Sequence, residues 1–159
     1  MKTFLFYNFL FLIFLVSCNS KDQENKSINK EQIIEEVKST EQTLFQLLKN
    51  GKIDQAFALH NNSSVYKNIS EGYARTYEQM DSTLKANSLK GIKTYDYEFT
   101  NRDFMVIDEN NALETLEGDK ILKGNADSII EKKGIIMSLL WTKANTKWVL
   151  NYLHSSYKN

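Results

Sequence analysis

Few side chains in this sequence are suited to acid–base chemistry, and none stands in a dense catalytic motif. His154 lies near the end of the chain and, at the period of two expected for a strand, shares a face with Trp148 and Tyr152. An imidazole titrates close to neutral pH, so His154 is a candidate hydrogen-bonding group or weak acid and base of a pocket. A structural histidine bonded to the backbone fits the same position. Tyr66 is the second catalytic candidate.

The remaining titratable groups favour ordinary structural roles. His60 closes a predicted helix, where a surface or capping position accounts for it. A metal site needs three or four ligands, and two separated histidines do not supply them, so we predict neither a metal nor a cofactor. Asp96 and Glu98 stand two residues apart on the polar face of a predicted strand, where solvated side chains are expected instead of an acid–base pair.

Aromatic side chains in strand-like segments are the candidate ligand contacts. Tyr95, Tyr97 and Phe99 alternate with Thr94, Asp96 and Glu98, which predicts a strand over residues 93–100 with one aromatic face. Small-molecule pockets are lined mainly by apolar and aromatic groups. The predicted ligand-binding residues are therefore Tyr95, Tyr97, Trp141, Trp148, Tyr152 and His154.

Residues 134–156 must position most of these side chains, because they read as two long strands joined by a polar turn at residues 144–146. In the first strand Ile135, Met137, Leu139 and Trp141 share a face. In the second strand Trp148, Leu150, Tyr152 and His154 are expected to share one. Two further strand pieces are predicted at residues 104–107 and 112–117, and a long polar excursion at residues 118–133.

The first half of the domain is predicted to be helical. Apolar residues from Ile33 to Leu48 recur at spacings of three, four and seven, which indicates an amphipathic helix from Lys30 to about Lys49, ended by Asn50-Gly51. A shorter helix should run from Ile53 to about His60, and a brief strand over residues 65–69. Residues 70–72 should open a third helix in which Tyr73, Tyr77, Met80 and Leu84 form a core stripe. Helices followed by strands predict an α+β fold.

The N-terminus resembles that of a bacterial lipoprotein. A basic start and an apolar run too short to cross a bilayer predict a signal peptide over residues 1–17. Residues 15–18, Leu-Val-Ser-Cys, resemble a lipobox, which implies lipidation of Cys18, the only cysteine of the chain. Residues 18–30 read as a flexible tether and residues 31–159 as one domain. The expected location is the bacterial cell envelope, with the lipid anchor in the outer membrane and the domain on either its periplasmic or its surface side.

Charge and cysteine content exclude several functions. Without residues 1–17 the chain keeps 19 basic and 20 acidic side chains, a formal charge of −1. Nucleic acid binding normally needs a basic surface, so none is expected. A disulfide within the chain is impossible with a single cysteine.

The order of elements, the segment Lys49–Phe57 and the closing residues 148–156 resemble the nuclear transport factor 2-like superfamily, particularly its SnoaL-like and ketosteroid isomerase-like domains. The resemblance implies a cone in which three N-terminal helices pack on a strongly curved, mainly antiparallel sheet around a pocket for small apolar ligands. In the isomerase-like enzymes a carboxylate follows the second helix and moves the proton. Asn68 stands at that place here, and an amide cannot accept the proton.

Three functions remain open on this reading. The first is a non-catalytic, membrane-tethered module that binds a small apolar ligand or a partner protein. The second is a cyclase or isomerase in which His154, Tyr66 or Tyr152 carries the proton chemistry. The third is a homodimer whose sheet faces pack together, which predicts that Trp141 and the strand tyrosines are buried only in the dimer. The first function is favoured, with dimerisation expected as well.

Overall fold

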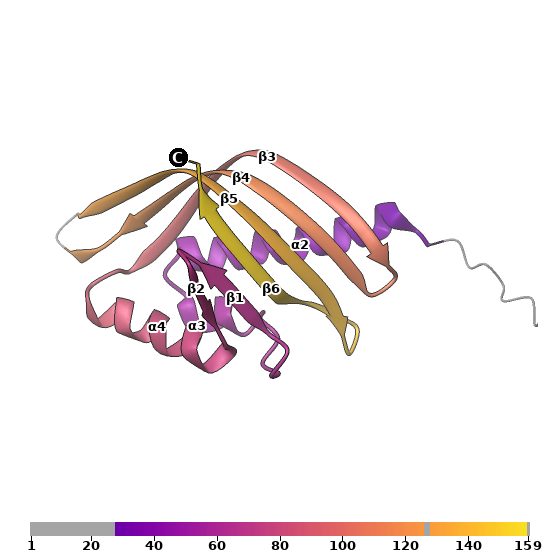
Figure 1. The fold of residues 1–159 in the computed structure, drawn as a ribbon, viewed down its shortest axis with the longest axis horizontal. Helices are drawn as coiled ribbons and strands as arrows, with labels where there is room; N and C mark the ends of the chain where they lie inside the picture. The colour runs from indigo at the N-terminus through magenta and orange to yellow at the C-terminus, as the bar shows by residue number, and fades with distance from the viewer. Residues whose placement is uncertain (1–27, 126–127, 159) are drawn as a thin grey trace, which may run out of the picture.

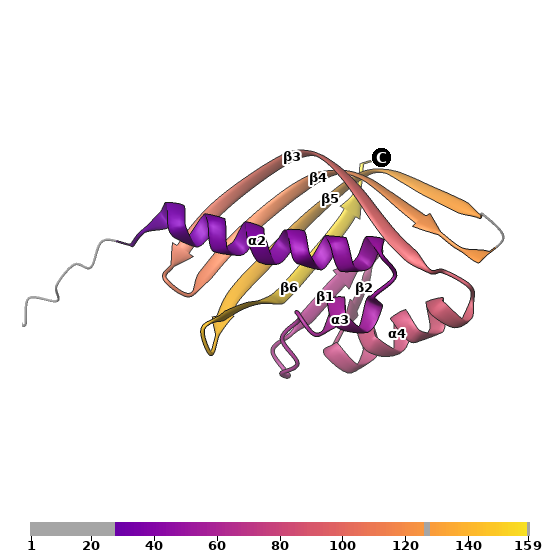
Figure 2. The ribbon, with the colours of Figure 1, turned by 180° about the vertical axis from the view of Figure 1, so that it is seen from behind.

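The computed structural model describes residues 28–125 and 128–158. A six-stranded sheet in the order β2-β1-β6-β5-β4-β3 curves around helix α2, which crosses its concave face (Figures 1 and 2). All neighbouring strands are antiparallel except β1 and β6, which run parallel. The predicted α+β architecture with a curved, mainly antiparallel sheet is confirmed.

Helix α2 spans Lys30–Lys49, as its apolar spacing predicted. The side chain of Asn29 caps its first turn by accepting a hydrogen bond from the Gln32 amide at 3.0 Å. Gly51, with φ of +71°, ends the helix in the left-handed conformation that glycine adopts without strain. The buried stripe of α2 consists of Ile33, Val37, Glu41 and Leu44, so a carboxylate lies within the apolar face.

The central hairpin is confirmed, with β5 at Ile129–Ala144 and β6 at Lys147–Tyr157. Asn145 and Thr146 form the turn, both at positive φ, as a two-residue hairpin loop with the correct twist requires. Trp141 pairs with Leu150 whereas Leu140 pairs with Tyr152, so Asn151 is an extra residue in β6. Such a bulge moves the following side chains to the opposite face of the sheet.

The bulge corrects the prediction that one face carries Trp148, Leu150, Tyr152 and His154. Trp148 and Leu150 face α2, but Tyr152 and His154 stand opposite Leu140 and Ser138 on the outer face. The cause lies far away in the sequence. The segment before β1 joins β6 at this point, where the Asn61 amide donates to the Leu150 carbonyl and the Asn61 side chain donates to Asn151.

The other long strands exceed their predicted lengths. Strand β3 runs over Thr94–Asp108 and includes the piece predicted separately at residues 104–107. Strand β4 runs over Asn111–Lys123, and β5 already begins at Ile129, so the predicted excursion at residues 118–133 is wrong. Gly118 does not break the strand. A Cβ at Gly118 would lie 2.1 Å from the Glu98 carbonyl oxygen, so glycine permits the close approach of β3.

The segments between α2 and β3 are shorter than predicted. Helix α3 spans only Ile53–Phe57, and β1 spans Lys67–Ser70. Residues 70–72 do not open a helix; they turn the chain into β2, Tyr73–Arg75, where Tyr73 is 65% exposed. Helix α4 spans Tyr77–Leu89 and begins at a capping box formed by Thr76 and Gln79. It has no buried residue, so the predicted core stripe is wrong.

The hydrophobic core therefore lies between α2 and the concave face of the sheet. Its largest fully buried side chain is Trp141, and Val37 and Leu139 are completely buried beside it. Helices α3 and α4 lie at the end of α2, below the far end of the sheet (Figure 2). The cone thus has a closed half under α2 and a more open half beside α4.

Candidate functional site

A groove of about 770 Å³ runs between α2 and the edge strand β3. This volume falls within the range of about 300–1,000 Å³ typical of small-molecule sites. Its apolar floor is made by Phe45 of α2 together with Tyr97 and Phe99 of β3. The ring centroid of Phe45 lies 4.9 Å from that of Tyr97 and 4.9 Å from that of Phe99, so the three rings form one continuous aromatic surface.

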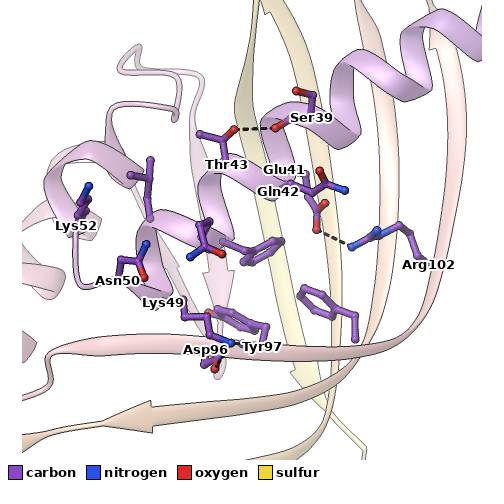
Figure 3. Close-up of a pocket in the computed structure, with 14 residues that line it drawn as sticks. Ser39, Glu41, Gln42, Thr43, Lys49, Asn50, Lys52, Asp96, Tyr97 and Arg102 are labelled. Carbon is purple, nitrogen blue, oxygen red and sulfur yellow. Dashed lines mark hydrogen bonds and ion pairs between the residues drawn. The ribbon is translucent and has the colours of Figure 1, made fainter.

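Charged pairs stand at the two ends of this floor (Figure 3). At one end the Nη2 atom of Arg102 donates a hydrogen bond to Glu41 Oε1 at 2.9 Å. At the other end Lys49 pairs with Asp96 at 2.9 Å. The Asp96 side chain is only 12% exposed, so it is not the freely solvated group that the strand pattern predicted. An aromatic floor with polar groups at both ends can hold an apolar body and orient polar substituents.

A second carboxylate lies behind Arg102, inside the core. Glu114 of β4 accepts a hydrogen bond from Trp141 Nε1 at 2.8 Å, and its other oxygen lies 3.4 Å from Arg102 Nε. The Glu41 and Glu114 side chains are 1% and 0% exposed. Glu41 Oε2 and Glu114 Oε1 have no hydrogen-bond partner in the part of the chain that the structure describes. One guanidinium therefore serves two buried carboxylates.

This shortage of positive charge changes the acidity of both groups. Burial and, next, the nearby Glu41 charge raise the pKa of Glu114 to about 7, against the opposing effects of Trp141 and Arg102. Burial also raises the pKa of Glu41. A carboxyl group with a pKa near 7 can exchange protons at neutral pH. Both oxygens that lack a hydrogen bond are buried, however, so a substrate in the groove does not reach them in this conformation.

The catalytic candidate Tyr66 lies in a different cluster, between α3, β1 and α4. Its side chain is fully buried, its hydroxyl has no hydrogen-bond partner within residues 28–125 and 128–158, and burial raises its pKa. The His60 ring is 5.5 Å from the Tyr66 ring, and burial lowers the pKa of His60 to about 4. His60 is half-buried, and its Nδ1 lies 3.3 Å from the Ala56 carbonyl oxygen of α3, which agrees with the predicted capping role. Asn68 is buried beside Ser70, whose hydroxyl donates to the Asn68 amide oxygen.

The structure separates the six predicted ligand-binding residues. Tyr97 lines the groove, and Tyr95 is buried two positions away, where Asn87 of α4 donates to its hydroxyl at 3.3 Å. Trp141 and Trp148 are buried under α2, and Trp148 Nε1 donates to Glu36 at 2.9 Å. His154 and Tyr152 occupy the outer face, away from the groove. The six residues therefore do not form one site.

Sequence reasoning missed Glu41, Arg102 and Glu114. A signal was present for the two acids. Glu41 stands between Val37 and Leu44 at helical spacing, and Glu114 stands between Ala112 and Leu116 on an otherwise buried strand face. A charge at a core position is costly unless it is paired, so each interruption of an apolar pattern pointed to a buried partner.

The geometry defines an α+β cone with a concave sheet face, and comparison with solved structures gives its class: the chain has the nuclear transport factor 2-like fold. A nuclear transport factor 2-like superfamily protein from Salmonella enterica serovar Typhimurium is 12% identical, with a TM-score of 0.69 over 82% of this chain and 94% of that one. A proposed dehydratase of the same family from Streptomyces avermitilis is 11% identical, with a TM-score of 0.69 over 82% and 99%.

The fold is also similar to that of an association domain. The association domain of CaMKII from C. elegans is 16% identical, with a TM-score of 0.59 over 80% of this chain and 96% of that one. No protein-family model matches the chain, and no curated protein matches it either. At these identities the comparisons establish the fold, while the function must be argued from this chain's own residues.

Within residues 28–125 and 128–158, no helix has both the length and the apolar character needed to cross a membrane. In the same residues, no group of three or more histidine, cysteine or acidic side chains is placed to hold a metal ion.

Proposed function

We propose that this protein is a lipid-anchored binding module of the bacterial cell envelope that holds a small molecule with an apolar body in the α2–β3 groove, without catalysis. The observation that carries the proposal is the floor of Phe45, Tyr97 and Phe99, an aromatic surface that remains open between a helix and an edge strand. Aromatic side chains left accessible in a concave site are typical of ligand binding.

The absence of catalysis is supported by where the titratable groups lie. The carboxylate oxygens of Glu41 and Glu114 that lack a hydrogen bond are buried, the Tyr66 hydroxyl is buried in another cluster, and His154 is on the outer face. An acid–base catalyst must come within hydrogen-bond reach of the reacting group. Binding without proton transfer fits this distribution of groups better than catalysis does.

The anchor rests on the sequence. Signal peptide residues 1–17, Cys18 and most of the tether lie outside the described residues, and α2 begins at Lys30. Full-length protein expressed in a Gram-negative host with radiolabelled palmitate should incorporate label, and Cys18→Ser should not. Equal labelling of both proteins would remove the lipoprotein assignment.

Binding can be tested with residues 19–159, which contain every helix and strand of the described fold. Native mass spectrometry would first look for a retained small molecule. The uncharged fluorophore N-phenyl-1-naphthylamine would then be titrated against wild type, Phe99→Leu and Phe104→Leu. Both phenylalanines lie on β3 and pack partly buried against the core, but only Phe99 lines the groove.

Phe99→Leu should weaken binding of the fluorophore several-fold, and Phe104→Leu should leave it unchanged. Equal effects of the two substitutions, or no binding to the wild type, would contradict the groove as the site. This matched pair separates loss of a groove contact from a general loss of core packing.

An enzymatic function is the alternative that one observation favours, the pKa of about 7 at Glu114. A cyclase or isomerase of the SnoaL-like type could use this carboxyl group if Arg102 moved aside and admitted substrate. In that case Glu114→Gln would abolish turnover of an acidic ketone substrate while fluorophore binding persisted. Binding without turnover in the wild type would favour the module.

We also propose that the chain forms a homodimer through the outer face of the sheet. Trp141 is fully buried within one chain, so the expectation that it is buried only in a dimer is wrong. Instead Met105, Leu113, Leu140 and Tyr152 stand opposite one another across β3, β4, β5 and β6 on the outer face, and Met105 is 61% exposed. Met105→Lys should shift a dimer to monomer in native mass spectrometry, whereas a wild-type monomer would refute the interface.

A further inference from the structure

The concave face of the sheet changes character beyond α2, where it faces α4. Lys120 of β4 stands opposite Tyr97 of β3 and Lys132 of β5, so its side chain is on the inner face. Its Nζ atom lies 5.5 Å from the ring centroid of Tyr95 and 5.7 Å from that of Tyr97. Among the described residues Lys120 has neither an ion pair nor a side-chain hydrogen bond. The rings of Tyr95 and Tyr97 are thus the groups that lie against this ammonium group, in cation–π contact.

The charged groups around Lys120 do not balance. Lys132 pairs with Glu71 in the turn between β1 and β2, and Lys132 also lies over the Tyr157 ring at 5.2 Å. Arg75 of β2 acts on the same carboxylate and donates to the Ser70 hydroxyl at 3.1 Å. Glu71 is thus in direct contact with Lys132, and it attracts Lys120 and Arg75 from a longer distance. An ammonium group removed from water without a counter-charge in contact is costly, and burial lowers the pKa of Lys120 accordingly.

Helix α4, which lies below this end of the sheet (Figure 2), does not supply the missing negative charge. Its Asp81 pairs with Lys85 of the same helix, and its Glu78 accepts from the Thr76 hydroxyl at the helix start. The inner face continues from Lys120 to apolar residues, because Leu122 follows on β4 and stands opposite Ile130 of β5. The Ile130 side chain is 51% exposed although it lies on this concave side.

We propose that the inner face of the sheet beside α4 binds a small organic anion, with its carboxylate or phosphate oxygens at Lys120 and Lys132 and its apolar body along Leu122 and Ile130. This oxyanion site adjoins the α2–β3 groove and shares Tyr97 with it, because that ring has Phe45 on one side and Lys120 on the other. An anion would supply a counter-charge in contact with the Lys120 ammonium group, and the exposed Ile130 side chain beside the buried Leu122 would contact the rest of the ligand.

Isothermal titration of residues 19–159 tests the oxyanion site with three ligands that share a ten-carbon chain: decanoate, decyl phosphate and uncharged decanol. Lys120→Met replaces the ammonium group with an uncharged side chain of similar length. Lys123→Met is the matched control, because Lys123 lies on the same strand but is exposed. Lys132→Met provides a second, independent removal of charge should Lys120→Met fail to fold.

Wild type and Lys123→Met should bind at least one of the two anions, at least tenfold more tightly than decanol. Lys120→Met and Lys132→Met should lose this preference by tenfold or more, and Phe99→Leu should keep it. Tighter binding of decanoate would identify a carboxylate ligand, and tighter binding of decyl phosphate a phosphate ligand. Equal binding of decanol, unchanged affinity in both lysine variants, or no anion binding would overturn the proposal.

Discussion

The two halves of the concave sheet face differ in polarity and in how well a helix covers them. Under α2 the face is a dry core in which Val37, Leu139 and Trp141 are completely buried. Beside α4 the same face carries Lys120 and Lys132, and the helix contributes no buried residue. A strand rises about 3.3 Å per residue and a helix about 1.5 Å, so β5 extends further in space than α2, which covers it. One sheet therefore contributes a core at one end and a polar surface at the other (Figure 2).

The halves also differ in the sign of their uncompensated charge. Under α2 one cation, Arg102, serves the carboxylates of Glu41 and Glu114. Beside α4 the carboxylate of Glu71 is in direct contact with Lys132 and attracts Lys120 and Arg75 from a longer distance. In the first half the excess carboxylates are buried, and the pKa of both is raised. In the second half the excess charge is positive, and burial lowers the pKa of Lys120. The direction of each pKa shift thus follows from burial and from the neighbouring charges.

The largest test of this contrast compares the same substitution in the two helices. Leu44→Ala removes a side chain that is 2% exposed and leaves a cavity under α2, so the free energy of unfolding should fall by about 2–5 kcal/mol. Leu84→Ala in α4 removes a partly exposed side chain and should cost about 1 kcal/mol or less. Urea unfolding measures both. Equal losses would mean that α4 is as well packed as α2.

Glu114→Gln should have the next largest effect, and it should depend on pH. Because burial raises the pKa of Glu114 to about 7 from an ordinary 4.5, the folded chain keeps a proton that the unfolded chain has released between these values. The stability of the wild type should therefore fall as pH rises from 4.5 to 7. Glu114→Gln should reduce this fall by about 1–3 kcal/mol, measured as urea unfolding at pH 4.5 and 7.5. A fall of unchanged size would show that Glu114 remains ionised in the folded state.

Glu71→Gln should have a smaller effect on stability, with the opposite dependence on pH. Lys132 holds the pKa of Glu71 below its ordinary value, and Lys120 and Arg75 act in the same direction. The ionised group therefore stabilises the fold above about pH 4.5, and this contribution is lost as pH falls through the lowered pKa. Glu71→Gln should lower the urea midpoint at pH 7 and leave it nearly unchanged at pH 3. Glu98→Gln, an exposed control on β3, should change neither midpoint.

The fold was predictable where one segment carries its own pattern. The apolar stripe of α2 and its glycine stop gave the correct helix, and the alternation of residues 135–141 gave the correct inner face of β5. Predictions were wrong where the structure depends on a contact between two segments. The face of Tyr152 and His154 depends on the bulge at Asn151, and that bulge forms where Asn61 meets β6. No periodicity within β6 encodes that contact.

The candidate sites show the same limit. Tyr95 and Tyr97 were predicted as ligand contacts from their strand alternation, and Tyr97 does line the groove. Phe45 joins them only because α2 crosses β3, and Arg102 points inward only because the register of β3 shifts between Phe99 and Asn101. The sign of each site's charge could not be inferred from composition, since the chain as a whole is nearly neutral.

The sequence by itself determined the local elements of this protein: a long amphipathic helix, a central hairpin with a polar turn and an α+β order, each set by propensity and periodicity within about twenty residues. It also contains residues 15–18, on which the resemblance of the N-terminus to that of a lipoprotein depends. Only the tertiary structure decided which side chains meet. Glu41 and Arg102 are 61 positions apart, and Lys120 meets Lys132 through strand pairing. Burial and partners, which set the chemistry of these groups, are properties of the packed chain and not of any segment.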